Sequence, residues 1–536
     1  MKSQTPKTAY KVSMFMPKVS RKIFVSFFQN GDLFLRTLAS NTRYVGLSLL
    51  IFFLAVFCGF AEEEPSSTLK AAETKIYLLS LHETTRIALA NNFDIQLIKY
   101  DAWIARTKNK TAQSIYDTVF ESEATYRNNQ RQQTSTILGT KVVDNEYAMG
   151  LSKKLPTGTK LAVDLDNQRS YSNSVFSTSS LAHDSTLGMT VEQDLGKNFF
   201  GIQDRGVVKM TKLEVENAEY TTLDKIEESI ASVQKAYWDL VLQLEMAHIE
   251  EDMVDQARKL YELHQEKLKT GLVEKPEAAA SQANYLNRQN ALTLRRHQVQ
   301  TKINVLKLYL NITDDDINIK PTVQLLSPSI DINLEDSLRQ AFEYRRDYKW
   351  TRNEIQAKEI QLSMKKNNVW PEINLSASLE RNGLGDHFKQ AVTNITDEDN
   401  PHFLAQLRVS IPLENSEARG QLQAAELENA KTLIQLKYIE RKIAIGIIDQ
   451  VRQCRVLGEV ALSQEEISNL QAQKLEEEEK RFLQGRSDTD TMIRFQEDVL
   501  SSKDAAANAK HRYLTALIDL RQEMGTLLDT YWDGKL

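Results

Sequence analysis

The sequence predicts a mainly α-helical protein with a small β part, built from two internal structural repeats. Two segments, Gly201–Gly271 and Gly420–Gly485, each follow one helical pattern, and at 1.5 Å per residue either corresponds to a helix of roughly 100 Å. Alternating apolar and polar residues, typical of strands, precede both segments. The same order of patterns then occurs twice, which is the signature of a repeated unit.

The segment 1–61 predicts an export signal. Tyr44–Phe60 is an uncharged, largely apolar run that follows Arg43 and precedes three consecutive glutamates. A basic flank, an apolar run and small residues near Ala61 are typical of a secretory signal peptide, here with a long amino-terminal region. The alternative is an uncleaved anchor, for which the run is short. Cys58 lies in this run, and a lipid-modified cysteine of a lipoprotein is one interpretation of it. Phe57, directly before it, is too bulky for the usual lipoprotein signal, so we treat Cys58 as an ordinary apolar residue.

Two helical stretches mark the start of each repeat. Leu81–Asp94 matches Leu334–Asp347 at a constant offset of 253 in the numbering, and both continue as one short helical pattern. We therefore expect a signal peptide over 1–61, a first repeat over 62–320 and a second repeat over 321–536. Each repeat has the order short helix, strands, long helix and return helix. The segment 311–329 between them has no helical period and is predicted to be a linker.

Two strands are expected in each repeat, with one additional hairpin in the first. The additional hairpin has the turn Pro156-Thr157-Gly158 between two alternating runs, and it fits either an extracellular loop or further strands of the sheet. An ordinary soluble sheet is the alternative for all of these runs. The strands that we expect are Val119–Tyr126, Tyr147–Leu155, Lys160–Asp166, Ser185–Leu195, Ile373–Leu379 and Phe403–Leu413.

Each long helical segment carries an apolar seam with alternating spacings of four and three, as in a coiled coil. In the first segment the seam includes Ile226, Tyr237 and Leu240. In the second segment, whose numbers are higher by 214, Cys454 takes the place of Leu240. A redox thiol is one interpretation of Cys454, and a small buried hydrophobic side chain is the one that we favour.

Glycines end both long segments, after which the pattern turns back. Gly271 and Gly485 occupy equivalent places, and glycine is the preferred residue just after a helix. Pro276 suits the first turn of the next helix. The predicted unit is therefore a pair of antiparallel helices joined at a tip.

Charge and composition exclude several functions. The chain has 67 Lys+Arg and 73 Asp+Glu, which gives a net charge of −6. Segment 1–61 contributes +7 to this charge, so segment 62–536 carries −13, and that acidic balance argues against nucleic acid as a partner. A mean hydropathy of −0.43 excludes a bundle of many membrane-spanning helices. We find no metal-binding, nucleotide-binding or catalytic motif, so we expect no enzyme activity, no metal and no cofactor.

Several local motifs, each present near its expected place in one or both repeats, resemble the TolC-type outer-membrane efflux protein family. The segment 193–201 resembles the approach to the family's first long helix, with Asp194 where proline is usual, and Ile411-Pro412-Leu413 is its second copy. Ala236–Leu240 (AYWDL) resembles the family's seam motif. Gly271-Leu272-Val273 resembles its helix-tip motif. The resemblance covers about residues 75–530.

The resemblance implies a homotrimeric channel in the cell outer membrane of a Gram-negative bacterium. In such a channel three chains share one transmembrane β-barrel of 12 strands, four from each chain, and the long helices form an antiparallel coiled-coil α-barrel, a tunnel in the periplasm. The implied partners are a periplasmic adaptor (membrane fusion) protein, an inner-membrane transporter that supplies the energy, and the outer-membrane lipid. The channel is then a passive exit duct for small molecules.

The resemblance places the functional residues at the helix tips. There we expect Gly271, Leu272, Val273, Gly485, Arg486 and Ser487 to contact the adaptor. Asp488 and Asp490 form an acidic entrance ring in a trimer or, alternatively, cap the return helix. Two other functions stay open: the exit duct of a type I protein-secretion system, and a periplasmic coiled-coil adaptor or structural protein, which would lack the membrane strands.

Overall fold

The computed structural model describes residues 75–132, 140–174, 179–271, 273–314, 317–326 and 332–531. All of them belong to the second of two compact units, Glu73–Leu536. The predicted signal peptide with Cys58 lies outside the described residues, and so does Leu272 of the predicted tip.

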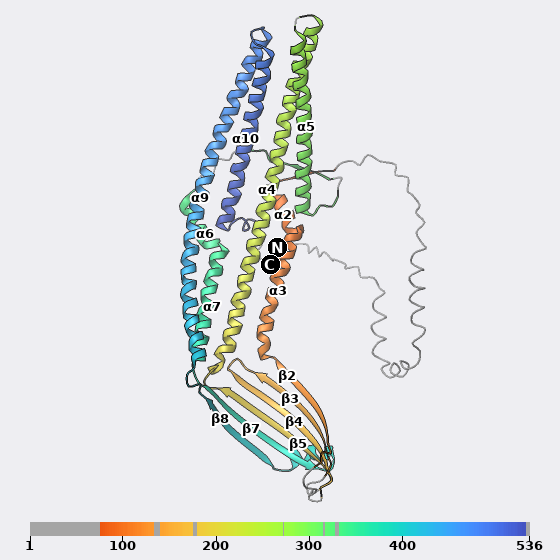
Figure 1. The fold of residues 1–536 in the computed structure, drawn as a ribbon, viewed down its shortest axis with the longest axis vertical. Helices are drawn as coiled ribbons and strands as arrows, with labels where there is room; N and C mark the ends of the chain where they lie inside the picture. Colours follow the sequence, from red (N-terminus) through yellow and green to blue (C-terminus); the bar gives the residue numbers. More distant parts are fainter. Residues whose placement is uncertain are drawn as a thin grey trace, which may run out of the picture. The chain divides into compact units, whose positions relative to one another are not determined.

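Two pairs of antiparallel helices make up nearly half of this unit (Figure 1). The long helices α4 and α9 have 68 residues each, and the return helices α5 and α10 have 36 each. The first and last residues of α9 and α10 have numbers that are higher by 214 than those of α4 and α5, as the sequence predicts. The borders of the repeats at residues 61 and 320 stay predictions. None of the described helices combines the length and apolar composition that crossing a bilayer requires. The four helices are α4 Ile202–Lys269, α5 Lys275–Leu310, α9 Ser416–Leu483 and α10 Thr489–Met524.

The prediction of one short helix at the start of each repeat is wrong in one respect, because each repeat begins with two helices. The backbone of Asn92 is extended, its side chain accepts a hydrogen bond from the Ile95 amide at 3.1 Å, and its Nδ2 donates to the Tyr309 carbonyl at 2.9 Å. Arg345, at the equivalent place in the second repeat, breaks the second copy and donates to the Glu523 carbonyl at 2.9 Å. The four helices are α2 Leu81–Asn91, α3 Phe93–Gln113, α6 Leu334–Tyr344 and α7 Arg346–Asn368.

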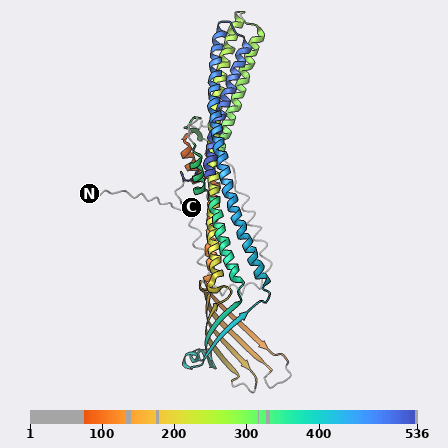
Figure 2. The same ribbon diagram turned by 90° about the vertical axis from the view of Figure 1, so that its left-hand side faces the viewer.

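One antiparallel sheet lies at the end of the helices opposite to their tips (Figures 1 and 2). Its order is β2-β3-β4-β5-β7-β8, so the additional hairpin of the first repeat forms two strands of the same sheet. The family resemblance implied four strands per chain, and the described sheet has six. The strands are β2 Thr118–Asn129, β3 Val142–Lys154, β4 Thr159–Ser172, β5 Leu181–Asp194, β7 Glu372–Gly385 and β8 Pro401–Ser410.

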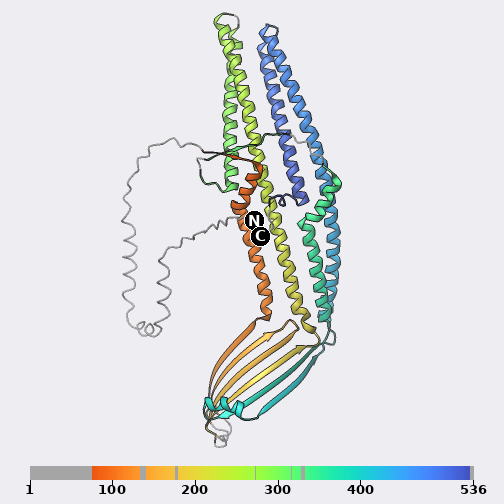
Figure 3. The ribbon, with the colours of Figure 1, turned by 180° about the vertical axis from the view of Figure 1, so that it is seen from behind.

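Several smaller elements differ from the prediction. Strand β8 ends at Ser410 rather than Leu413, because Pro412 has no amide to donate to a sheet. The predicted linker contains a strand, β6, which pairs in parallel with β1. Helix α8, not predicted, lies at the end of the sheet remote from the long helices (Figure 3). The remaining elements are β1 Lys75–Leu79, β6 Ile317–Pro321, α8 Phe388–Asp397 and the 3-10 turns η1 Ser114–Tyr116 and η2 Phe199–Gly201.

The predicted apolar seams form the core between the helices. In α4, Ile226, Tyr237 and Leu240 are fully buried. Cys454 of α9 is also fully buried and belongs to the apolar cluster around Ile447. Its Sγ donates to the Ala516 carbonyl at 3.3 Å, and burial raises the pKa of the thiol to about 11. The interpretation of Cys454 as a small buried hydrophobic side chain is therefore confirmed.

Tyr237 should be among the most important core residues. We expect Tyr237→Ala to lower the free energy of unfolding by about 3–5 kcal/mol, because it empties a fully buried aromatic site. Tyr237→Phe removes only the hydroxyl, which donates to the Leu79 carbonyl at 3.0 Å, and should cost about 1 kcal/mol. Denaturation of the detergent-solubilised protein would measure both. Equal losses in the two variants would contradict a packing role for the ring.

Candidate functional site

The sheet has one largely apolar face. Successive residues of a strand point to opposite faces, and residues paired across an antiparallel ladder share a face. The pairing therefore places Phe403, Leu379 and Met189 side by side on one face. Phe403 is 69% exposed and Met189 is 53% exposed. The other apolar residues of this face are Phe120, Ala124, Tyr126, Val143, Tyr147, Met149, Leu151, Leu161, Val163, Leu165, Tyr171, Leu181, Leu187, Val191, Ile373, Leu375, Ala377, Ala405, Leu407 and Val409.

The opposite face of the sheet is polar and mostly acidic. Here Glu192 lies beside Ser376, and Glu380 lies beside His402. The remaining charged residues of this face are Glu121, Glu123, Arg127, Asp144, Glu146, Lys154, Lys160, Asp164, Asp166, Asp184, Asp194, Glu372 and Arg408. A sheet with an exposed apolar face and a polar face suits an interface between lipid and water.

A closely packed turn, Asn198–Gly201, joins the sheet to α4. Gly201 has a φ of +69°, and a Cβ on it would collide with the Pro156 carbonyl oxygen in the β3–β4 turn. Asn198, also left-handed, donates from Nδ2 to carboxylates of Asp194 and Asp204, at 2.9 Å each. Asp194 replaces the proline of the family's motif, and here it holds Asn198. The segment 193–201, which resembles the start of the family's long helix, is therefore a tightly packed connection between the strands and α4.

The predicted tip residues that the structure describes lie at the two turns remote from the sheet, between α4 and α5 and between α9 and α10 (Figure 1). Gly271 and Gly485 have φ values of +73° and +72° and are exposed. The Gly485 amide donates to the Phe482 carbonyl at 3.0 Å, and the Arg486 amide donates to the Arg481 carbonyl at 2.9 Å. Arg486 is exposed, while Val273 and Ser487 are half-buried. A left-handed glycine lets the chain reverse sharply at both turns. The contact of these residues with an adaptor stays a prediction.

Asp488 is the N-cap of α10. Its Oδ1 accepts a hydrogen bond from the Thr491 amide at 2.8 Å, and its Oδ2 accepts one from the Thr491 hydroxyl at 3.2 Å. These bonds lower the pKa of Asp488, so it stays ionised. Asp490 lies exposed in the first turn of the same helix. Asp488 therefore caps α10 in each chain, and a ring of the two aspartates remains a prediction.

The two helix pairs contact each other inside the chain just below their tips. His264 of α4 is buried; its Nε2 lies 3.4 Å from the hydroxyl of Thr489, and its ring centre lies 5.9 Å from that of Phe482. Burial lowers the pKa of His264, which favours the neutral ring. The structure therefore brings α4, the end of α9 and the start of α10 together just below the tips.

The AYWDL segment supplies a polar link between three helices. Tyr237 and Trp238 are buried, and the Asp239 carboxylate accepts from Lys302 of α5 at 2.7 Å and from His511 of α10 at 2.8 Å. Burial acts to raise the pKa of Asp239, but the bonds from His511 and Lys302 outweigh it and the pKa is lowered. The motif therefore both fills the core and ties α4 to the two return helices.

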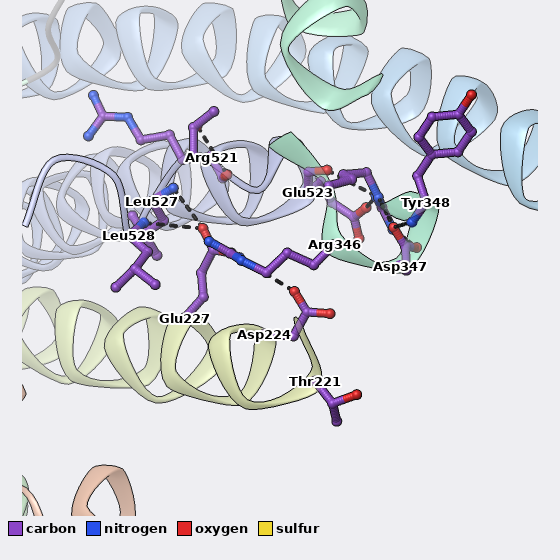
Figure 4. Close-up of polar contacts among 12 residues, drawn as sticks. Thr221, Asp224, Glu227, Arg346, Asp347, Tyr348, Arg521, Glu523, Leu527 and Leu528 are labelled. Carbon is purple, nitrogen blue, oxygen red and sulfur yellow. Dashed lines mark hydrogen bonds and ion pairs between the residues drawn. The ribbon is translucent and has the colours of Figure 1, made fainter. Parts of the chain in front are cut away.

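A buried polar joint, which the sequence did not predict, connects α4, α7 and the segment that follows α10 (Figure 4). Arg346 is 6% exposed and forms an ion pair with Glu227, which is 3% exposed. Glu227 also accepts from the amides of Leu527 and Leu528 at 2.7 and 3.2 Å. Burial raises the pKa of Glu227, against the opposing effect of Arg346. The one available signal was Arg345-Arg346-Asp347, where the first repeat has Asn92-Phe93-Asp94.

A metal site and a catalytic site have little support in the part of the chain that the structure describes. No group of three His, Cys, Asp or Glu side chains there could hold a metal ion. A groove of about 710 Å³ lies between α4, α7 and α9, lined by residues that include Trp350, Asp347 and Tyr438. Its lining mixes acids, bases and aromatic rings without an arrangement for catalysis. The expectations of no enzyme activity and no cofactor stay predictions.

Comparison with known proteins identifies the fold. No protein-family model matches the chain, and no curated protein matches its sequence. Solved structures do match it. The CmeC outer membrane channel of Campylobacter jejuni is 13% identical, with a TM-score of 0.61, and the match covers 87% of this chain and 93% of that one. The chain has the fold of an outer-membrane channel.

Two further structures support this outer-membrane channel fold. The outer membrane protein VceC of Vibrio cholerae is 16% identical, with a TM-score of 0.62 over 83% of this chain and 96% of that one. The open state of the MtrE outer membrane channel of Neisseria gonorrhoeae is 13% identical, with a TM-score of 0.61 over 88% of this chain and 95% of that one. The resemblance predicted from the motifs is confirmed as a likeness of fold, at identities too low to transfer a substrate or partner.

Proposed function

We propose that this protein is the outer-membrane exit duct of a tripartite efflux system. Three copies close the sheets into one barrel in the outer membrane, and their long helices form a coiled-coil tunnel in the periplasm. A periplasmic adaptor binds the helix tips, and an inner-membrane transporter supplies the energy. The duct itself passes small molecules without chemistry.

The observation that carries this proposal is the two-faced sheet at one end of a helical body with an outer-membrane channel fold. An apolar face as large as the one around Met189 is not stable in water unless lipid or protein covers it. The polar face, with Glu192 and Glu380, suits a water-filled lumen. A periplasmic adaptor or structural protein would have no use for six long strands of this kind.

Conductance in planar bilayers tests the proposal. The protein, purified in detergent and added to a lipid bilayer, should give stable ionic channels. Absence of any conductance from a detergent-dependent oligomer would refute the duct. Transport of a polypeptide rather than small molecules would instead favour the exit duct of a type I secretion system.

Charge selectivity tests the entrance ring. The double variant Asp488→Asn, Asp490→Asn should shift the reversal potential in a salt gradient toward zero, because six carboxylates of a trimer disappear from the tunnel entrance. Asparagine at 488 still caps a helix, so the fold of α10 is kept. Asp336→Asn on α6, remote from the tips, is the matched control. Equal selectivity in all three proteins would leave Asp488 with its capping role alone.

A further inference from the structure

The two outer edges of the sheet are free for pairing. Strand β2 pairs only with β3, and β8 pairs only with β7, within the described residues. An open edge in lipid leaves backbone amides and carbonyls without partners, which costs several kcal/mol per group. If the sheet lies in a membrane, as the proposed function requires, both edges must be covered.

The strand order makes a second copy of this chain the fitting partner. Five successive antiparallel pairings leave β2 and β8 running in opposite directions. The β8 edge of one copy can therefore extend the β2 edge of the next as one more antiparallel pair. Only an even number of strands per copy gives this result.

The two edges are also offset along the strands by the amount that a barrel needs. β8 runs back toward the helices. Across the sheet, the middle of β8, between Ala405 and Gln406, therefore lies opposite the start of β2 at Thr118. The middle of β2, between Glu123 and Ala124, lies about six residues further from the helices, which is an offset of one residue for each of the six strands. The chain of directly paired residues that fixes this level is Phe403, Leu379, Met189, Val163, Leu151 and Phe120.

A stagger of one residue per strand is the geometry of a closed barrel. It corresponds to a strand tilt of about 36°, inside the range of about 35–45° found in outer-membrane barrels. A flat sheet with level edges would have given no stagger and could not close. The offset between β8 and β2 therefore equals the offset that a closed barrel requires, and the sheet needs no rearrangement to close.

The staggered register also pairs suitable side chains between copies. It places Ala124 of β2 opposite Ala405 of β8, and Tyr126 opposite Phe403, all on the apolar face. On the polar face it places Glu121 opposite Arg408. Opposite charges and aromatic pairs across strands each favour pairing by about 0.2–1 kcal/mol.

We propose that β2 of each copy pairs with β8 of the next, with Ala124 opposite Ala405, and that three copies of six strands close an 18-stranded barrel. The proposal rests on the proposed function, which supplies the membrane and the number of copies. The barrel is about 1.5 times as wide as the 12-stranded barrel that the family resemblance implied. The added width comes from β3 and β4.

Disulfide cross-linking tests the pairing in the full protein. The double variant Ala124→Cys, Ala405→Cys should form covalent dimers and trimers on oxidation, and no larger species, because three links close a ring. The native Cys454 is buried and does not interfere, and Cys58, the other native cysteine, is replaced by alanine in every variant. Ala405→Cys combined with Ser122→Cys or Tyr126→Cys should cross-link less, which fixes the register.

The matched control is Glu123→Cys with Ala405→Cys, in which the two thiols lie on opposite faces and should not join. A protein that conducts in bilayers but gives no Ala124–Ala405 link, or gives covalent species above trimer, would overturn the 18-stranded barrel and leave the duct intact. A trimeric ladder from a protein without conductance would keep the pairing and refute the duct.

Discussion

Replacing Met189 with arginine should prevent stable insertion into a membrane. Met189 is exposed in the apolar face of the sheet, between Val163 and Leu379 on the neighbouring strands. An arginine on the lipid side near the bilayer midplane costs about 2–4 kcal/mol in each copy. We expect the variant to be largely lost from the outer-membrane fraction of cells, and to unfold from lipid vesicles at lower denaturant concentration than the native protein.

The adjacent residue supplies the control. Thr190 points to the polar face, beside Ser378 and Ala162. Thr190→Arg should insert normally, since its charge reaches the water-filled side. If both variants insert equally well, the face around Met189 does not meet lipid, and the membrane assignment of the sheet is wrong.

The repeated helices could be predicted from the sequence because their signals are local and occur twice. The glycines at 271 and 485 and the seam around Tyr237 follow from spacing alone, and the structure places each where the spacing requires. The break at Asn92 could not be predicted in this way, since asparagine occurs inside helices. There the decisive contact is the distant Tyr309 carbonyl, 217 residues along the chain.

The sheet shows a different limit. The alternating runs around Gly158 predict a hairpin, but whether that hairpin joins the main sheet depends on pairing with β2 and β5, which lie outside it. Register, and with it the apolar face and the edge offset, is a property of the whole sheet. The tips behave in the opposite way: the sequence allows Asp488 two roles, and the structure settles only the local one, the cap on Thr491.

The buried joint of Figure 4 should be highly sensitive to loss of its positive charge. We expect Arg346→Met to lower the free energy of unfolding by about 3–5 kcal/mol, because Glu227 would remain buried as an uncompensated carboxylate. The double variant Arg346→Met, Glu227→Gln should recover most of this loss. The side-chain amide oxygen of the glutamine that replaces Glu227 can still accept hydrogen bonds from the backbone amides of Leu527 and Leu528. Denaturation of the detergent-solubilised protein would measure each change.

Two readouts separate this effect from a general loss of packing. Arg339→Met removes an exposed pair with Asp336 and should cost no more than about 1 kcal/mol. In Arg346→Met the pKa of Glu227, already raised by burial, should rise further. A carboxyl pKa that is higher in the folded state means that the folded state binds more protons, so the loss of stability relative to the native protein should be smallest below about pH 4.5 and grow as the pH rises through the folded pKa of Glu227. A loss independent of pH, or one that the double variant does not relieve, would show that Arg346 acts by its volume and not by its charge.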